Sequence, residues 1–218
     1  HSYDTLLAEN FYNIDNFDEA KRIYNNLSKR GKSFKWYSSK QLAKIYIQEK
    51  NNIRALELVS KAYNNLENKN IYETFDFAEF LKNNEKFRDA IPDFTKIINK
   101  VEKKHPLYAE ARDGRGVAYE RINEWSKAER DLLASLDADP EQAYVINYLA
   151  YSWIEKGVKI EKSLKMLEKA NRLKLNDPYI TDSLGWALFK LERYKESKEH
   201  LQLAVKLLPG DPIVNDHY

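Results

Sequence analysis

The chain has 218 residues, which is long enough for a substantial core, and its 36 basic and 34 acidic residues give a net charge of +2 at pH 7. Because these charges are mixed along the chain, the composition argues against nucleic-acid binding as the main function, which usually needs a concentrated basic face. The absence of cysteine excludes disulfides, thiolate catalysis and cysteine-based zinc sites. No stretch approaches the ~20 apolar residues of a membrane span, so no direct membrane span is expected.

A small residue recurs at intervals of about 35 residues in two separate series. Antiparallel helices approach closely only where side chains are small, so the two series predict the two helices of a repeated hairpin. The small residues of the predicted first helices are Ala8, Ala43, Ala78, Gly116, Ala150 and Gly185. Those of the predicted second helices are Ala20, Ala55, Ala90, Ala128, Ser163 and Ser197.

This register divides the chain into six hairpins in sequence order, near residues 1–35, 36–70, 71–108, 109–142, 143–177 and 178–211, and residues 212–218 begin a further helix. Extra residues of the third hairpin, Lys103 to Pro106, are expected in a longer loop. The fifth hairpin has one extra residue in its turn, around Gly157. Asp177-Pro178 and Asp211-Pro212 each combine an N-cap acceptor with a proline at the first helical position, which predicts that a helix begins there.

The last complete hairpin carries the clearest motif. It reads Asp182-Ser183-Leu184-Gly185-Trp186-Ala187-Leu188, followed by Arg193-Tyr194 and Pro209. This pattern and its recurrence resemble the tetratricopeptide repeat (TPR) family, and the resemblance covers nearly the whole chain. It implies an all-α fold, a right-handed α-solenoid of about six helix–turn–helix hairpins in a single domain over residues 1–218.

A narrower resemblance covers mainly residues 109–217. The segments 147–153 and 182–186 resemble the C-terminal repeats of long proteobacterial TPR proteins, which are often envelope lipoproteins. Some of these act as adaptors that bring a periplasmic C-terminal processing protease to its substrates. The lipoprotein resemblance implies a bacterial protein that lies in the periplasm or is associated with the outer membrane. Without that resemblance, a cytoplasmic protein is expected. Both ends break off within the repeat pattern, so we expect a fragment of a longer repeat protein or a proteolytically trimmed core.

No catalytic constellation is found in the sequence. The four histidines, His1, His105, His200 and His217, have no metal-binding spacing and are expected on the surface. The six glycines form no phosphate-binding loop, and no serine has a nucleophile-elbow context. The sequence therefore predicts a protein that is not an enzyme and that holds no cofactor or metal.

The TPR resemblance implies a ligand groove lined by the first helices. The candidate groove residues are Tyr144, Asn147, Tyr151, Tyr179, Asp182, Trp186 and Phe189 in the last two hairpins, and Tyr72, Phe75, Lys40 and Lys44 in earlier ones. Aromatic rings bury large areas of a partner, and an Asn amide bonds a peptide backbone in both directions. The alternative is that these rings pack between neighbouring first helices. A chaperone-type carboxylate clamp on Lys40 and Lys44 is rejected, because Glu9 and Tyr72 stand where an Asn and a Lys would be required.

These features favour a non-catalytic scaffold that binds a protein or an extended peptide. The more specific expectation is an adaptor for a protease or an assembly complex of the bacterial envelope. Two alternatives remain at this stage. One is a structural repeat module that self-associates through exposed repeat ends. The other is the regulatory arm of a larger enzyme.

Overall fold

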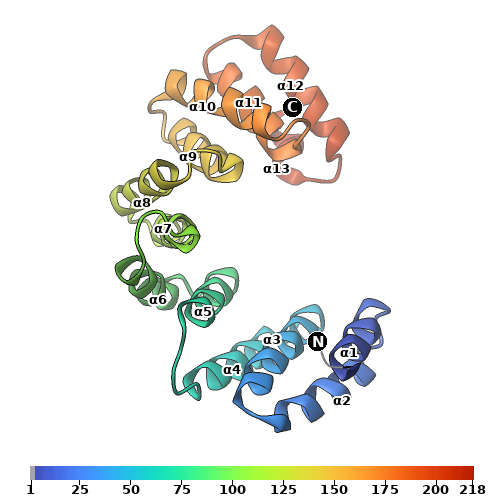
Figure 1. Cartoon of the computed structure of the whole chain (residues 1–218). Coiled ribbons are helices and arrows are strands. Elements are labelled where there is room, and N and C mark those ends of the chain that lie inside the picture. Colours follow the sequence, from blue (N-terminus) through green and yellow to red (C-terminus); the bar gives the residue numbers. More distant parts are fainter. Residues whose placement is uncertain (1–2) are drawn as a thin grey trace. The chain divides into compact units, whose positions relative to one another are not determined.

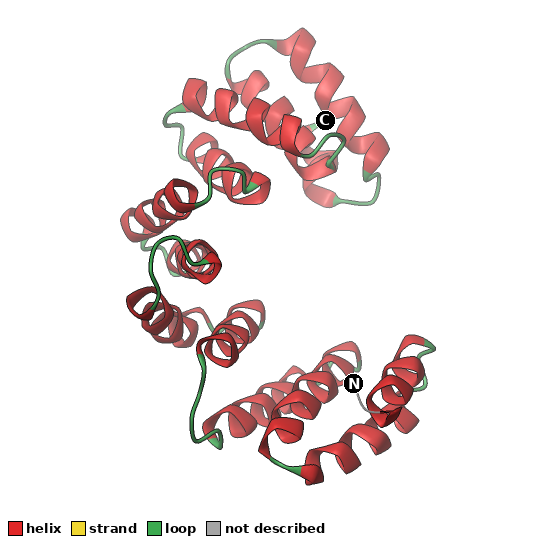
Figure 2. Ribbon diagram, in the orientation of Figure 1, coloured by secondary structure: helices red, strands yellow, loops and turns green. Residues whose placement is uncertain are grey.

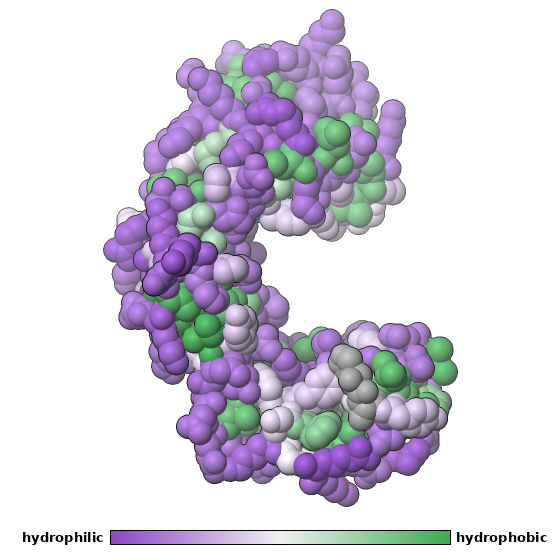
Figure 3. All heavy atoms as spheres, in the orientation of Figure 1, coloured by the Kyte–Doolittle hydropathy of each residue, from purple (hydrophilic) through white to green (hydrophobic). Residues whose placement is uncertain are grey.

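A computed structural model describes residues 3–218, which form α-helices, one short 3-10 helix and connecting loops, with no strand among them (Figure 2). The chain separates into two compact units, residues 1–100 and 101–218, and each is described by itself. On the face of the molecule that Figure 3 shows, hydrophilic residues predominate and smaller hydrophobic areas lie among them. That all six hairpins form one continuous domain stays a prediction.

The first unit contains three helical hairpins. Their helices are α1 (Tyr3–Asn13), α2 (Phe17–Leu27), α3 (Lys32–Gln48), α4 (Asn52–Asn64), α5 (Ile71–Asn83) and α6 (Phe87–Lys100), and a 3-10 helix (Ser28–Arg30) follows α2 (Figure 1). Each first helix packs on the second helix of its own hairpin, and α2 and α4 also contact the hairpin that follows.

The second unit contains three further hairpins and one additional helix. Its helices are α7 (Pro106–Arg121), α8 (Trp125–Ala138), α9 (Ala143–Glu155), α10 (Ile160–Leu173), α11 (Pro178–Lys190), α12 (Tyr194–Leu207) and α13 (Pro212–His217) (Figure 1). The first helices α9, α11 and α13 contact one another in that order, and α13 also packs on α12. The last short helix therefore packs as the first helix of a further hairpin.

The two series of small residues lie where the helices of each hairpin are closest. All twelve positions are buried, from Ala8 in α1 to Ser197 in α12. At Gly185 an added Cβ would lie 2.7 Å from Leu201 Cδ2, and the Ser197 hydroxyl donates to the Gly185 carbonyl at 2.9 Å. The sequence prediction that small residues set the helix spacing is confirmed at these positions.

The turns between the two helices of each hairpin are short and similar to one another. Five of the six turns have three residues, and the middle one adopts a left-handed conformation, as at Asp15 with φ of 58°. The turn between α9 and α10 has four residues and places Gly157 at φ of 66°, where glycine is favoured. The expected extra residue of the fifth hairpin is therefore in the turn.

The helix starts agree with the sequence at two places and differ at one. Asp177 and Asp211 cap α11 and α13, with Pro178 and Pro212 at the first helical positions. Pro106, however, lies in a helix and not in the expected loop: α7 begins there, because His105 Nδ1 accepts the Leu107 N–H at 3.1 Å. The first helix of the fourth hairpin thus begins before residue 109.

Arg115 interrupts the apolar register of the first helices, and the structure shows how it is buried. Its guanidinium makes two bonds to Asp131, from Nε at 2.6 Å and from NH2 at 2.9 Å. Asp131 is fully buried and also accepts a bond from Arg112 at 2.6 Å. A buried charge needs such pairing, so the carboxylate in α8 permits an arginine where the other hairpins carry an apolar residue.

Candidate functional site

The candidate residues of the second unit lie on three neighbouring helices, α9, α11 and α13, and we call them together the α9–α11–α13 face. It comprises Tyr144, Asn147, Tyr151, Tyr179, Asp182, Trp186 and Phe189 from the sequence prediction, and His217 from α13. Tyr144 and Tyr179, Asn147 and Asp182, and Tyr151 and Trp186 occupy equivalent positions of consecutive hairpins. Because α9 and α11 are in contact, these pairs form rows across the two helices.

Three aromatic rings of this face are exposed. Tyr144 is 54% exposed, Tyr179 is 52% exposed and Phe189 is 42% exposed. The Tyr144 hydroxyl donates to the Asp177 carboxylate at 2.8 Å, and the Lys174 ammonium lies 4.5 Å from the centre of the Tyr144 ring. Exposed rings that are already held in place offer a partner apolar area at a low entropic cost.

His217 lies among the predicted residues and is not on the surface, so the expectation of a surface histidine is wrong here. Its side chain is 7% exposed, and its Nδ1 lies 2.7 Å from Asp182 Oδ2. The imidazole stacks on Trp186, with ring centroids 4.3 Å apart, and lies 6.1 Å from the Tyr151 ring. The missed signal is spacing, because His217 follows Asp182 by 35 residues, which is one repeat. His105 and His200 are partly buried, and His1 lies outside the described residues.

Trp186 and Tyr151 are half-buried and take part in packing between first helices. The Trp186 indole N–H donates to Glu155 of α9 at 2.8 Å, and the ring stacks on Phe189 with centroids 5.2 Å apart. Burial raises the pKa of Tyr151 to about 12, and the nearby carboxylates of Glu155 and Asp182 act in the same direction. Both residues connect neighbouring hairpins, as the packing alternative expects.

Two acceptors of the face are buried without a donor. Asn147 Oδ1 and Asp182 Oδ1 have no hydrogen-bond partner within residues 3–218, although Asp182 is only 4% exposed. Four other side-chain atoms in the described chain share this state, but none belongs to a predicted groove position. A buried acceptor without a donor costs roughly 1–3 kcal/mol, and these two stand at equivalent positions of adjacent helices.

The candidate residues of the first unit are arranged differently. Lys40 pairs with Asp76 and lies 5.2 Å from the Trp36 ring, so its charge is already compensated, whereas Lys44 is exposed. Phe75 packs edge-on against Phe94 with centroids 6.1 Å apart, and Tyr72 is 59% exposed. These four residues form no cluster like the one on α9, α11 and α13.

Metal sites and membrane-spanning helices are both absent from the part of the chain that the structure describes. No group of three or more His, Cys, Asp or Glu side chains is placed to hold a metal ion in residues 3–218. Over the same range, no helix combines the length and the apolar character that a bilayer crossing requires.

The comparisons with known proteins agree with this architecture. Residues 76–143 match the family model described as Tetratricopeptide repeat. A TPR repeat-containing protein of Pseudomonas aeruginosa is 25% identical over 136 residues, which are 62% of this chain and 22% of that relative. The chain thus corresponds to a minor part of the relative's length.

Solved structures show the same fold at low identity. The structure of PilW, described as a widely conserved type IV pilus biogenesis factor, covers 98% of this chain with a TM-score of 0.76 and 16% identity; 96% of that chain is matched. The structure of YrrB, described as a TPR protein with an unusual peptide-binding site, covers 82% of this chain with a TM-score of 0.57 and 13% identity; 89% of that chain is matched. The predicted fold class, an all-α solenoid of such repeats, is confirmed.

The family match, the relative and the shared fold agree with one another. TPR folds are in general non-catalytic scaffolds for protein–protein interaction, and no catalytic family is indicated. Residues 76–143 match the tetratricopeptide-repeat family model, and the chain has the all-α solenoid fold of tetratricopeptide-repeat proteins.

Proposed function

We propose that the α9–α11–α13 face binds an extended peptide segment of a partner protein. The observation that carries this proposal is the set of exposed rings on two adjacent first helices, Tyr144 in α9 and Tyr179 and Phe189 in α11. Asn147 and Asp182 follow Tyr144 and Tyr179 by three residues, which is about one helical turn.

The exposed rings supply apolar contact for such a peptide. Tyr144 and Tyr179 lie one repeat apart at the start of α9 and α11, and Phe189 lies near the end of α11. Tyrosine is enriched among residues that dominate binding energy. The peptide-binding site named for YrrB, which has the same fold, supports a peptide ligand.

The cellular role that we propose is an adaptor of the bacterial envelope, which presents a client protein to a protease or an assembly complex. Support for a bacterial setting comes from the relative in Pseudomonas aeruginosa, and PilW supports a role in assembly. Self-association and a regulatory role in a larger enzyme remain predictions from the sequence, and no contact described here favours either one.

A selection from a library of random linear peptides tests the binding proposal. Peptides that bind the native chain should bind about tenfold or more weakly to the Tyr144→Ser, Tyr179→Ser double variant, because each buried ring contributes roughly 1–3 kcal/mol. These rings are exposed in the free protein, so their loss should leave the helical circular dichroism spectrum unchanged.

The matched control is Tyr3→Ser. Tyr3 is 77% exposed on α1 of the other unit, so this variant removes the same chemical group away from the proposed face. Equal affinity of the selected peptides for the native chain and the double variant would contradict the proposal.

A further inference from the structure

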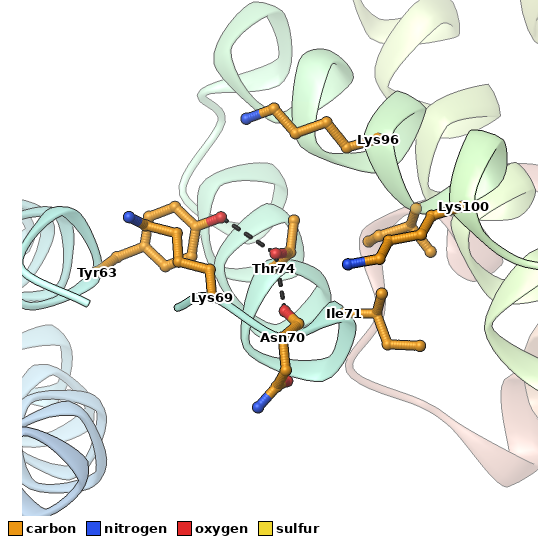
Figure 4. Close-up of a pocket in the computed structure, with 8 residues that line it drawn as sticks. Tyr63, Lys69, Asn70, Ile71, Thr74, Lys96 and Lys100 are labelled. Atoms are coloured by element: carbon orange, nitrogen blue, oxygen red, sulfur yellow. Dashed lines mark hydrogen bonds between the residues drawn. The ribbon is translucent and has the colours of Figure 1, made fainter. Parts of the chain in front are cut away.

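A cavity in the first unit lies outside every predicted groove position. Its volume is about 290 Å³, and it is lined by residues from the end of α4, the following loop, the start of α5 and the end of α6. Figure 4 shows Lys69 and Lys100 on opposite sides of Thr74, with the Lys69 ammonium turned toward Tyr63, Ile71 below Lys100 and Lys96 above Thr74. Three lysines and no acidic residue line this cavity.

Two of the three ammonium groups have no carboxylate partner. Lys69 Nζ donates to the Leu66 carbonyl at 2.9 Å and lies 5.0 Å from the centre of the Tyr63 ring. Lys96 is paired with Asp93 at 2.7 Å. No carboxylate of the described chain lies within ion-pair distance of Lys69 or Lys100, so the cavity has an uncompensated positive charge.

The polar groups in the cavity wall, apart from the lysines, are already hydrogen-bonded within the protein. The Tyr63 hydroxyl donates to Thr74 Oγ1 at 3.3 Å, and the Thr74 hydroxyl donates to the Asn70 carbonyl at 2.9 Å. The Asn70 side chain accepts from the first N–H groups of α5 at 2.9 Å. The groups left to recognise a ligand are therefore the ammonium donors, above an apolar floor that includes Ile97, which is 1% exposed.

The ammonium donors and the apolar floor together indicate what kind of ligand the cavity can bind. Ammonium groups bond oxyanions with charge-assisted hydrogen bonds, which are about twice as strong as neutral ones. The apolar floor suits a methylene chain beside the anion, because long polar side chains bury their stems against apolar surface. A glutamate side chain has both parts, and its size fits the cavity.

We infer that this cavity is a second binding site, which takes the carboxylate of a glutamate in an acidic peptide segment at the Lys100 ammonium, with Lys69 as a second positive charge on the other side of Thr74. The site is distinct from the α9–α11–α13 face and does not depend on it, because all its lining residues belong to the other unit. The cavity of the first unit would bind a partner through its carboxylates, whereas the α9–α11–α13 face would bind a partner mainly through apolar contact.

Calorimetric titration with acetylated tetraglutamate amide tests the inference. The Lys69→Ala, Lys100→Ala double variant should bind this peptide about tenfold or more weakly than the native chain, since hydrogen bonds to charged groups contribute roughly 1.5–3 kcal/mol. The Lys86→Ala, Lys61→Ala variant is the control: both lysines are exposed and lie outside the cavity lining, so it has the same net charge as the test variant. The control should bind as the native chain does.

Three results would overturn the inference. One is the absence of binding by the native chain, and another is an equal loss of affinity in the control, which would indicate a general charge effect. The third is tight binding of inorganic phosphate with no binding of tetraglutamate, which would assign the cavity to a free anion. A second variant, Ile97→Ala, enlarges the floor and should weaken tetraglutamate more than it weakens inorganic phosphate.

Discussion

The imidazole of His217 stacks on the indole of Trp186, with ring planes only 9° apart. The same imidazole contacts Asp182, so the last helix is joined to α11 by a ring contact and a hydrogen bond at one residue. The ring contact and the hydrogen bond act together, and they hold α13 against α11.

Replacing His217 by alanine should loosen α13. The change removes the partner of the buried Asp182 carboxylate and the ring beside Trp186, which should reduce the free energy of local opening by about 1–3 kcal/mol. Amide hydrogen exchange at Val214, which is 1% exposed, should become faster. Ile213→Ala is the control, because that side chain is 59% exposed. Unchanged exchange in His217→Ala would contradict the assigned contact.

The buried ion pair between Arg115 and Asp131 should be a sensitive point for stability. Asp131→Ala removes the buried carboxylate that Arg112 and Arg115 share and should lower the free energy of unfolding by about 3–5 kcal/mol. The double variant Arg115→Leu, Asp131→Leu should regain part of that loss, because apolar residues can replace a buried pair but Arg112 still lacks its carboxylate. Urea denaturation measures both. A double variant as unstable as the single one would show that the pairing is not the cause.

Glycine at the closest helix approach should resist substitution. Gly185→Ala gains about 1 kcal/mol of helix propensity, but its Cβ would meet the Leu201 side chain at 2.7 Å and the Leu201 backbone nitrogen at 3.1 Å. Overpacking of this kind costs about 1–3 kcal/mol, so we expect a net loss of thermal stability. Gly116→Ala, whose nearest contact is 3.0 Å from the Leu132 side chain, should lose less. A higher melting temperature for Gly185→Ala would contradict the packing.

The carboxylate of Glu129 should give the second unit part of its acid sensitivity. Glu129 pairs with Lys159 and accepts a bond from the buried Trp153 indole at 2.7 Å, and the hydrogen bond from Lys159 is the main cause that holds its pKa below the usual value of 4.5. A depressed carboxyl pKa adds stability above 4.5 that is lost as the pH falls through the folded-state pKa.

Glu129→Gln keeps an acceptor for Trp153 but cannot titrate. Its free energy of unfolding should therefore fall less steeply with acidification than that of the native chain, measured by urea denaturation across this pH range. Parallel curves for the two proteins would mean that Glu129 does not contribute to the acid dependence.

Repetition made most of the fold predictable. Small residues at one spacing, such as Ala8, Ala43 and Ala78, can be recognised in sequence because the same helix contact recurs in every hairpin, and all three are buried. Helix caps such as Asp177 were predictable because they depend only on neighbouring residues. The acceptor side chain and the proline at the first helical position stand next to each other in the sequence.

The site was less predictable, because its contacts join residues one repeat apart. The burial of His217 depends on Asp182 and Trp186 of another helix, and a histidine near the end of a short segment has no local feature that reveals this. The lysine-lined cavity combines a loop with the ends of three helices, so positions on first helices alone did not indicate it. For His217, the signal that would have helped is the pairing of opposite charges one repeat apart, which Lys103 and Asp137 also show.

The most direct test of the proposed function is site-specific crosslinking in the cells that make the protein. A photoreactive phenylalanine analogue is placed at position 144, at position 179 or, as the control, at position 3, each of which carries an exposed tyrosine. The account predicts that one and the same partner crosslinks from positions 144 and 179 and not from position 3. Crosslinks of equal yield from all three positions, or none from 144 and 179, would contradict a peptide-binding face on α9 and α11.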